Sequence, residues 1–287
     1  MKKLLSLTLA LVIALALAAC TRSPGEPDPA AQPDNGQGST TPEAPVWHLE
    51  CKTEVYAEDF QADDGTAVAS VSYETPLLVI VDESGTPAQE SDEVPEALRT
   101  AQAVFNDAFS DYRSGGAGAG GLKADATDWY AQCNEGAGLF IPYSDTLQIA
   151  RVYETDSFVS VRAFCSLYLG GAHPMDAMLT WNFDKEQACF LSLEDLATDS
   201  AALNELIATQ ILQQITDQGD QDSYFDGFED TIREKERFEG CFDEGGLTVA
   251  FSEYEIAPYA GGIPTFTIPY EALRPVLNER GGALLSL

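Results

Sequence analysis

The N-terminal stretch of this chain has an unusual order of cationic, apolar and small residues. This pattern indicates that the folded part of the protein lies in the residues that follow it. Met1-Lys2-Lys3 is a short cationic start, residues 4–19 are almost entirely apolar, and small residues precede Cys20. In a bacterial lipoprotein signal peptide the cations stay cytoplasmic, the apolar helix enters the membrane, and small side chains fit the peptidase cleft. An apolar run of 16 residues falls short of the roughly 20 that span a bilayer. We therefore expect residues 1–19 to be a cleaved lipoprotein signal peptide and Cys20 to carry lipid, including palmitate.

Residues 20–45 have the composition of a linker. Six prolines stand among Gly, Ser, Thr, Asn and Gln, and the stretch holds no apolar run. Prolines stiffen a chain, and these polar residues bury too little surface to offset the entropy of ordering. We expect a disordered tether that holds a domain at the extracytoplasmic face of the cell membrane. The lipid bilayer is then a partner through acylated Cys20.

The charge balance excludes whole classes of function. The chain has 15 Lys and Arg against 47 Asp and Glu, a formal net charge of −32 at pH 7, whereas binding to nucleic acid needs clustered cations. Its two histidines, His48 and His173, are too few for a histidine zinc site or an imidazole relay. Gly-x-Ser-x-Gly, Ser-x-x-Lys and His-Glu-x-x-His patterns do not occur in the sequence. We expect no nucleic-acid partner, no catalytic residue, no cofactor and no bound metal ion.

Residues 46–137 show strand and helix periodicities in turn, and we interpret them as a smaller N-terminal α+β subdomain. The glycine-rich segment 115–121 is interpreted as a flexible break, either a hinge or an irregular surface loop. Around it, alternating positions predict a hairpin of strands over 47–55 and 69–81, and three- to four-residue spacing predicts helices over 98–112 and 122–133.

In residues 138–287, most of the sequence patterns predict short strands. Because groups of strands alternate with groups of helices, we expect an α+β fold, an antiparallel β-sheet meander with helices packed on one face. The elements predicted are strands over 147–153, 158–169, 178–183, 247–251 and 263–268, helices from about Ser200 and around 225–232, and a short helix over 270–278.

Three segments of this C-terminal part occur in one order: Gly170-Gly171-Ala172-His173-Pro174, then Asn182-Phe183-Asp184 with Leu191-Ser192-Leu193-Glu194-Asp195-Leu196, and finally Tyr254 to Gly262 leading to Ile268-Pro269-Tyr270. In this order they resemble the extracytoplasmic domain family shared by the lysozyme-sensing anti-sigma factor RsiV and by PdaC-type peptidoglycan deacetylases. The resemblance covers roughly residues 139–278. It implies an α+β domain outside the membrane, a setting at the cell wall and, in one branch, a protein ligand.

The chain also departs from that family. No cytoplasmic segment precedes Met1 and no deacetylase domain follows Leu287, so we expect a stand-alone sensory or accessory module. The turn from Asp184 to Ala188 lacks the glycine that the family leads us to expect.

Two segments hold candidate binding residues. His173 with Asp176 fits a base and its orienting carboxylate, but the flanking glycines and Pro174 favour a turn in which the imidazole binds backbone. Tyr254, Pro258 and Tyr259 beside Ala260-Gly261-Gly262 suit either a rigid aromatic surface for a protein groove or a sugar face, or a packed turn. The candidate binding residues are Tyr254, Pro258, Tyr259 and His173.

Acidic residues and cysteines give weaker signals. The acids over 217–226 fail the spacing of an EF-hand calcium loop, so a solvated acidic loop is favoured. Beyond Cys20, several disulfide pairings and reduced thiols stay open for Cys51, Cys133, Cys165, Cys189 and Cys241.

These observations favour a membrane-anchored, extracytoplasmic, non-catalytic binding module of the cell envelope. Its expected ligand is lysozyme or a similar cationic wall hydrolase, because an acidic body steers a basic partner. The alternative is an accessory factor that recognises peptidoglycan for a separate wall-modifying enzyme, with Trp47, Trp181, Tyr254 and Tyr259 as stacking faces. A hydrolase that uses an unrecognised carboxylate pair is a third possibility.

Overall fold

The hairpin expected near the N-terminus forms, with a first strand longer than its alternation suggests. In the computed structural model, which describes residues 45–287, β1 (His48–Gln61) pairs antiparallel with β2 (Ala67–Val81). The expected signal peptide, Cys20 and nearly all of the expected tether lie outside the described residues.

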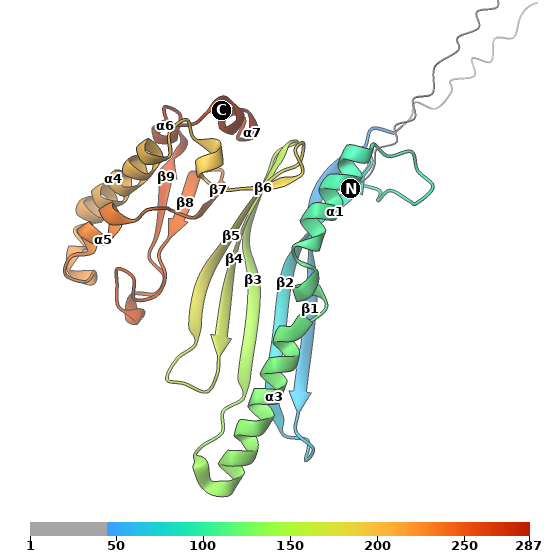
Figure 1. Ribbon diagram of the computed structural model, residues 1–287, viewed down its shortest axis with the longest axis vertical. Coiled ribbons are helices and arrows are strands. Elements are labelled where there is room, and N and C mark those ends of the chain that lie inside the picture. The colour runs from blue at the N-terminus through green and yellow to red at the C-terminus, as the bar shows by residue number, and fades with distance from the viewer. Residues whose placement is uncertain (1–44) are drawn as a thin grey trace, which may run out of the picture. The chain divides into compact units, whose positions relative to one another are not determined.

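One sheet joins this hairpin to the strands that follow it (Figure 1). β2 pairs in parallel with β3, and the predicted meander then adds antiparallel neighbours in chain order. The strands are β3 (Tyr143–Glu154), β4 (Phe158–Tyr168), β5 (Met175–Asp184) and β6 (Cys189–Leu191). Segments 46–137 and 138–287 therefore share a six-stranded sheet.

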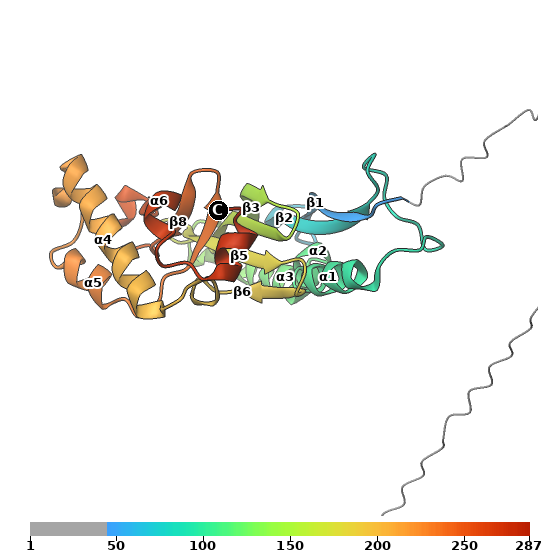
Figure 2. The same ribbon diagram turned by 90° about the horizontal axis from the view of Figure 1, so that it is seen from above.

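Helices cross one face of this sheet and make the long connection that a parallel strand pair requires. They are α1 (Glu96–Asp107), α2 (Ser110–Arg113) and α3 (Gly116–Gln132), followed by a π-helical turn over Cys133–Ala137. The apolar stripe of α1 buries Ala101 and Phe105 against strand residues such as Val159 and Phe183. Figures 1 and 2 show α1 and α3 running along the strands.

The glycine-rich segment 115–121 is neither a hinge nor an irregular loop, which corrects the sequence interpretation. It forms the first turns of α3, where Ala119, Leu122 and Ala126 pack against the sheet. Gly115 starts the helix with φ of 72°, and a Cβ there would lie 2.5 Å from Tyr56 Oη. Because small residues let the helix lie close to the strands, tertiary packing outweighs the poor helix propensity of glycine.

A second sheet follows in the C-terminal part. β7 (Gly240–Asp243), β8 (Gly246–Ala250) and β9 (Thr265–Pro269) pair antiparallel in that order. Helices α4 (Ser200–Gln218), α5 (Phe228–Glu234), α6 (Tyr270–Leu273) and α7 (Glu279–Leu284) accompany it. We call this part, residues 194–287, the C-terminal module. The expected α+β class is confirmed, although β7 and α7 have no counterpart among the predicted elements.

The hairpin between β5 and β6 forms without its expected glycine. Ala188 takes φ of 53°, the left-handed conformation that a glycine would adopt without strain. The Asp184 carboxylate accepts hydrogen bonds from the backbone N–H groups of Glu186 and Gln187, at 2.9 and 2.8 Å. These bonds hold the turn and offset the cost at Ala188.

The structure also shows the state of the cysteines and the character of the helices. The five cysteines within residues 45–287 are all unpaired: four are half-buried and Cys241 is buried. In that same part of the chain, no helix is both long enough and apolar enough to pass through a membrane.

Candidate functional site

The C-terminal module packs on the face of β4 and β5 opposite to α1 and α3, and one end of this contact is closed. Ser160 Oγ donates to Asn182 Oδ1 at 2.7 Å, and Asn182 Nδ2 donates to Gly240 O at 2.9 Å. The backbone N–H of Phe242 in turn donates to Ser160 Oγ at 2.8 Å. All of these groups are buried, and Phe158 of β4 packs edge-on against Phe242 beside them.

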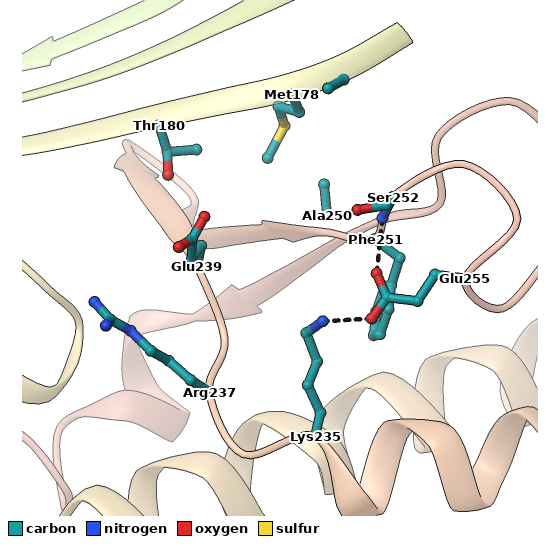
Figure 3. Close-up of a pocket in the computed structure, with 10 residues that line it drawn as sticks. Met178, Thr180, Lys235, Arg237, Glu239, Ala250, Phe251, Ser252 and Glu255 are labelled. Carbon is teal, nitrogen blue, oxygen red and sulfur yellow. Dashed lines mark hydrogen bonds and ion pairs between the residues drawn. The ribbon is translucent and has the colours of Figure 1, made fainter. Parts of the chain in front are cut away.

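The other end of the same contact is hollow. A cavity of about 720 Å³ lies between the face of β3–β5 and the loop after β8, with Phe164 and Asp176 on the strand side and Glu253 and Tyr259 on the loop side. A second cavity of about 230 Å³ adjoins β5 further along. In Figure 3, Met178 and Thr180 point from β5 toward the C-terminal module, where Thr180 lies above Glu239.

The candidate residues from the sequence meet at the rim of the larger cavity. The His173 ring stacks on Tyr259 with centroids 3.8 Å apart and an interplanar angle of 23°. His173 Nε2 lies 3.1 Å from the Tyr254 hydroxyl, and the two tyrosine rings are 6.2 Å apart at 26°. We call His173, Tyr254 and Tyr259 the aromatic cluster. Its members come from the β4–β5 turn and from the loop between β8 and β9.

Backbone geometry fixes how the cluster is presented. Tyr254 has φ of 62°, a left-handed conformation that a bulky residue rarely adopts, and its side chain is 53% exposed. Pro258 precedes a single 3₁₀ turn over Tyr259–Gly261, and its carbonyl accepts from Gly261 N–H at 2.8 Å. Pro258 itself is exposed beside the cluster. The loop therefore holds an exposed aromatic surface with little freedom to rearrange.

The imidazole of His173 binds backbone, as the turn interpretation expects. Its Nδ1 lies 2.6 Å from Pro174 O, and because a carbonyl only accepts, Nδ1 carries the proton of this bond. In the neutral ring Nε2 is then the acceptor for the Tyr254 hydroxyl. Asp176 makes no hydrogen bond to the ring, so the pair does not form a base with an orienting carboxylate.

Carboxylates without cationic partners line the hollow end. Asp176 Oδ1 is buried and has no hydrogen-bond partner, and Glu253 and Glu239 form no ion pair with any described residue. Of the cations nearby, Lys235 pairs with Glu255 and Arg237 with Glu194, whereas Arg162 of β4 forms no ion pair with a described residue. Burial raises the pKa of the Tyr259 hydroxyl above its usual value, and Asp176, Glu253 and Tyr254 add to this effect. The site therefore favours neutral or cationic ligand groups over anions.

The two tryptophans proposed as sugar-stacking faces do not join the site, which corrects that part of the peptidoglycan hypothesis. Trp181 points to the helix side of the sheet and packs edge-on against Phe109, with centroids 5.1 Å apart. Trp47 packs against the same core cluster. Only the tyrosines of that set are near the cavity.

Sequence reasoning missed the strand side of the site. Phe164, Met178 and Asp176 alternate along β4 and β5 with core residues, and a two-residue period alone does not tell which face will be covered. Within residues 45–287, no group of three or more His, Cys, Asp or Glu side chains is arranged to hold a metal ion. The arrangement of exposed rings beside a cavity is suited to binding.

Comparison with known proteins finds one family match, in the C-terminal part of the chain. Residues 194–271 match the family described as "Protein of unknown function (DUF3298)". A solved DUF3298 family structure from Bacteroides fragilis NCTC 9343 is similar, with a TM-score of 0.59 and 19% identity over 84% of this chain and 97% of that one. This similarity shows a shared fold.

A second solved DUF3298 structure, from Pseudomonas aeruginosa PAO1, has a TM-score of 0.49 and 20% identity over 80% of this chain and 95% of that one. No curated protein matches the sequence.

Proposed function

We propose that this chain is a lipid-anchored, non-catalytic binding module of the bacterial cell envelope, of the RsiV/PdaC type, and that its ligand is lysozyme or a similar cationic wall hydrolase. Residues 1–19 direct export, Cys20 carries the lipid, and the proline-rich segment tethers the domain outside the membrane. The observation that carries the proposal is the aromatic cluster at the rim of a cavity that is lined by unpaired carboxylates.

The cluster has the properties of a protein-binding anchor. Interface hot spots are enriched in tyrosine, because its ring offers a large contact area and loses few rotamers on binding. Stacking against His173 already restricts the Tyr259 ring, so little further conformational freedom is lost when a partner binds.

The charge of the site suits a cationic partner. A guanidinium or ammonium group can lie over a tyrosine face and reach Asp176 or Glu253 at the same time. The net charge of −32 draws basic proteins toward the molecule from a distance. The resemblance to a lysozyme-sensing family points to the same class of ligand.

Titration calorimetry of the full chain in detergent with lysozyme tests this proposal. We expect binding at low salt that weakens as salt rises, and Tyr259→Ala should weaken it roughly tenfold or more. Phe225→Ala is the control, because Phe225 is an exposed aromatic, 40%, outside the site. Absence of heat at tens of micromolar lysozyme would contradict the proposed ligand.

Peptidoglycan is the alternative ligand, and one observation favours it. Exposed tyrosine rings beside carboxylates can stack on a sugar face and accept hydrogen bonds from its hydroxyls. Co-sedimentation with purified insoluble wall separates the two hypotheses, since a module that binds only lysozyme stays in the supernatant. Release of soluble fragments from the wall by the protein alone would contradict a non-catalytic role.

The anchor is tested separately. Cells fed labelled palmitate should incorporate it into the wild-type protein and not into Cys20→Ala, and that variant should leave the membrane fraction. Equal labelling of both proteins would contradict lipidation at Cys20.

A further inference from the structure

β5 has a free edge along most of its length. All ten of its residues pair with β4, but β6 pairs only with Asn182, Phe183 and Asp184 on the other side. Among residues 45–287, no strand pairs with the other side of the seven residues Met175–Trp181. Within the described part of the chain, no hydrogen bond from outside the sheet reaches their backbone groups. Unpaired backbone donors and acceptors of this kind are a template for another strand.

The space beside this edge is lined on both sides. On the side of the C-terminal module, two neighbouring cavities of about 230 and 120 Å³ follow β5 and share Thr180, Arg237 and Glu239 in their walls. On the helix side, Met175 and Phe190 are exposed, at 54% and 37%, near the two ends of the edge. The edge therefore lies between a polar groove and an apolar border.

The unpaired acidic groups beside the edge outnumber the unpaired cations of the groove. Glu239 in the groove and Asp176 of β5, which lines the larger cavity next to it, form no ion pair with described residues. The two cations that line the groove, Lys235 and Arg237, are paired with Glu255 and Glu194. A second copy of the chain is a poor occupant, because two molecules of net charge −32 repel each other. The occupant that the charges fit is basic.

We propose that the β5 edge, Met175–Trp181, binds an extended basic segment of a partner protein by β-strand addition. In this mode the backbone bonds supply affinity and alternate side chains supply specificity. Every second side chain of the added strand faces the C-terminal module and meets Glu239 in the groove or Asp176 at the larger cavity. The side chains between them lie on the helix side, beside Leu179 and Met175. The edge thus selects a segment of at least seven residues in which Lys or Arg alternates with apolar residues.

This inference goes beyond the proposed function, since it concerns a strand edge instead of the aromatic cluster. A partner could use both surfaces, but the two are separable by mutation. Tyr259→Ala, which should weaken lysozyme binding, should leave binding at the edge unchanged.

The test uses the full chain in detergent and a nine-residue peptide of alternating Lys and Val, capped at both ends. Hydrogen exchange monitored by mass spectrometry should show protection of the backbone amides of 175–181 when the peptide is bound. Methylation of alternate peptide nitrogens on the edge-facing side should reduce affinity roughly tenfold or more, because it removes donors to β5. A peptide of alternating Glu and Val should bind at least tenfold more weakly.

Two matched variants test the charge argument. Asp176→Asn and Glu239→Gln should each lower the affinity for the Lys-Val peptide about threefold. Glu83 is an exposed acid on a distant loop, so Glu83→Gln should leave this affinity unchanged. Glu239 is exposed, so its variant tests the proposal without disturbing the fold. Failure to bind the peptide, protection confined to other segments, or equal affinity for the N-methylated peptide would each overturn the inference.

Discussion

The two ends of the face that β4 and β5 turn toward the C-terminal module differ in how their polar groups are satisfied. At the closed end, Ser160 and Asn182 bind each other and the backbone of β7. At the hollow end, four residues beyond Ser160 along β4, Phe164 is 42% exposed and Asp176 Oδ1 has no partner. The same two strands thus hold the module in place at one end and leave a surface for a ligand at the other.

This difference has a simple physical origin. Gly240 allows β7 to lie against its neighbours at the closed end, where a Cβ would come within 2.6 Å of Thr248 O. The loop after β8 instead turns away over Tyr254, which leaves the cavity. We infer that substitutions at the closed end change stability, and that substitutions at the hollow end change binding.

The largest effect is expected for Phe158→Ala. Phe158 is fully buried and belongs to the core of the C-terminal module although it lies on β4, so its loss should lower the free energy of unfolding by about 3–5 kcal/mol. Phe164→Ala, on the same face of the same strand, should cost less than about 1 kcal/mol. Urea denaturation measures the free energy of unfolding of both variants. Similar losses for the two would contradict the proposed difference between the closed end and the hollow end.

Ser160→Ala should have the next largest effect. It leaves Asn182 Oδ1 without its donor and the Phe242 N–H without its acceptor, both buried, at an expected cost of about 1–3 kcal/mol. Ser166→Ala lies at the hollow end and should change stability by no more than about 0.5 kcal/mol. If Ser160→Ala left the free energy of unfolding unchanged, the closed end would not be held by this network.

Two cysteines distinguish the ends by reactivity. Burial raises the pKa of the Cys241 thiol at the closed end to about 12. Burial also raises the pKa of the Cys165 thiol, but Cys165 is only half-buried and lines the larger cavity. At pH 8 iodoacetamide should label Cys165 roughly tenfold or more faster than Cys241, as followed by peptide mass mapping. Faster labelling of Cys241 would show that the closed end opens readily.

The raised pKa also predicts a dependence of stability on alkaline pH. An unfolded thiol has a pKa of about 8.5, so the folded state favours the neutral form of Cys241. This contribution is fully present below about pH 8.5 and is lost as pH rises toward 12. Unfolding midpoints from pH 8 to 11 should therefore fall less steeply for Cys241→Ala than for the wild type, and equal slopes would argue against a buried, neutral thiol.

The smallest effect is expected for Glu244→Gln. Glu244 pairs with Arg151 between the β7–β8 turn and β3, but the two side chains are 67% and 46% exposed. Water and salt screen such a pair, so the unfolding midpoint should not shift measurably. A clear shift that disappears in high salt would show that surface charges help to hold the module on the sheet.

The regular elements were largely predictable because their signals are local. Alternation over 47–55 and 69–81 predicted the hairpin, and apolar spacing after Ser200 predicted α4. The glycine-rich segment 115–121 was misjudged, because its helix depends on contacts with Tyr56 and the sheet that local propensity does not contain. β7 was missed for a similar reason, since its four residues are held by a neighbour strand and by Asn182.

By itself the sequence determined the α+β class, most of the strands and helices, the acidic charge and the identity of the residues at the rim of the cavity. It could not determine that His173 and Tyr254, 81 residues apart, would meet, or that Trp181 would turn into the core. Only the tertiary structure decided these points. Periodicity records which side chains avoid water, whereas the distance between side chains from different strands depends on how the two sheets pack.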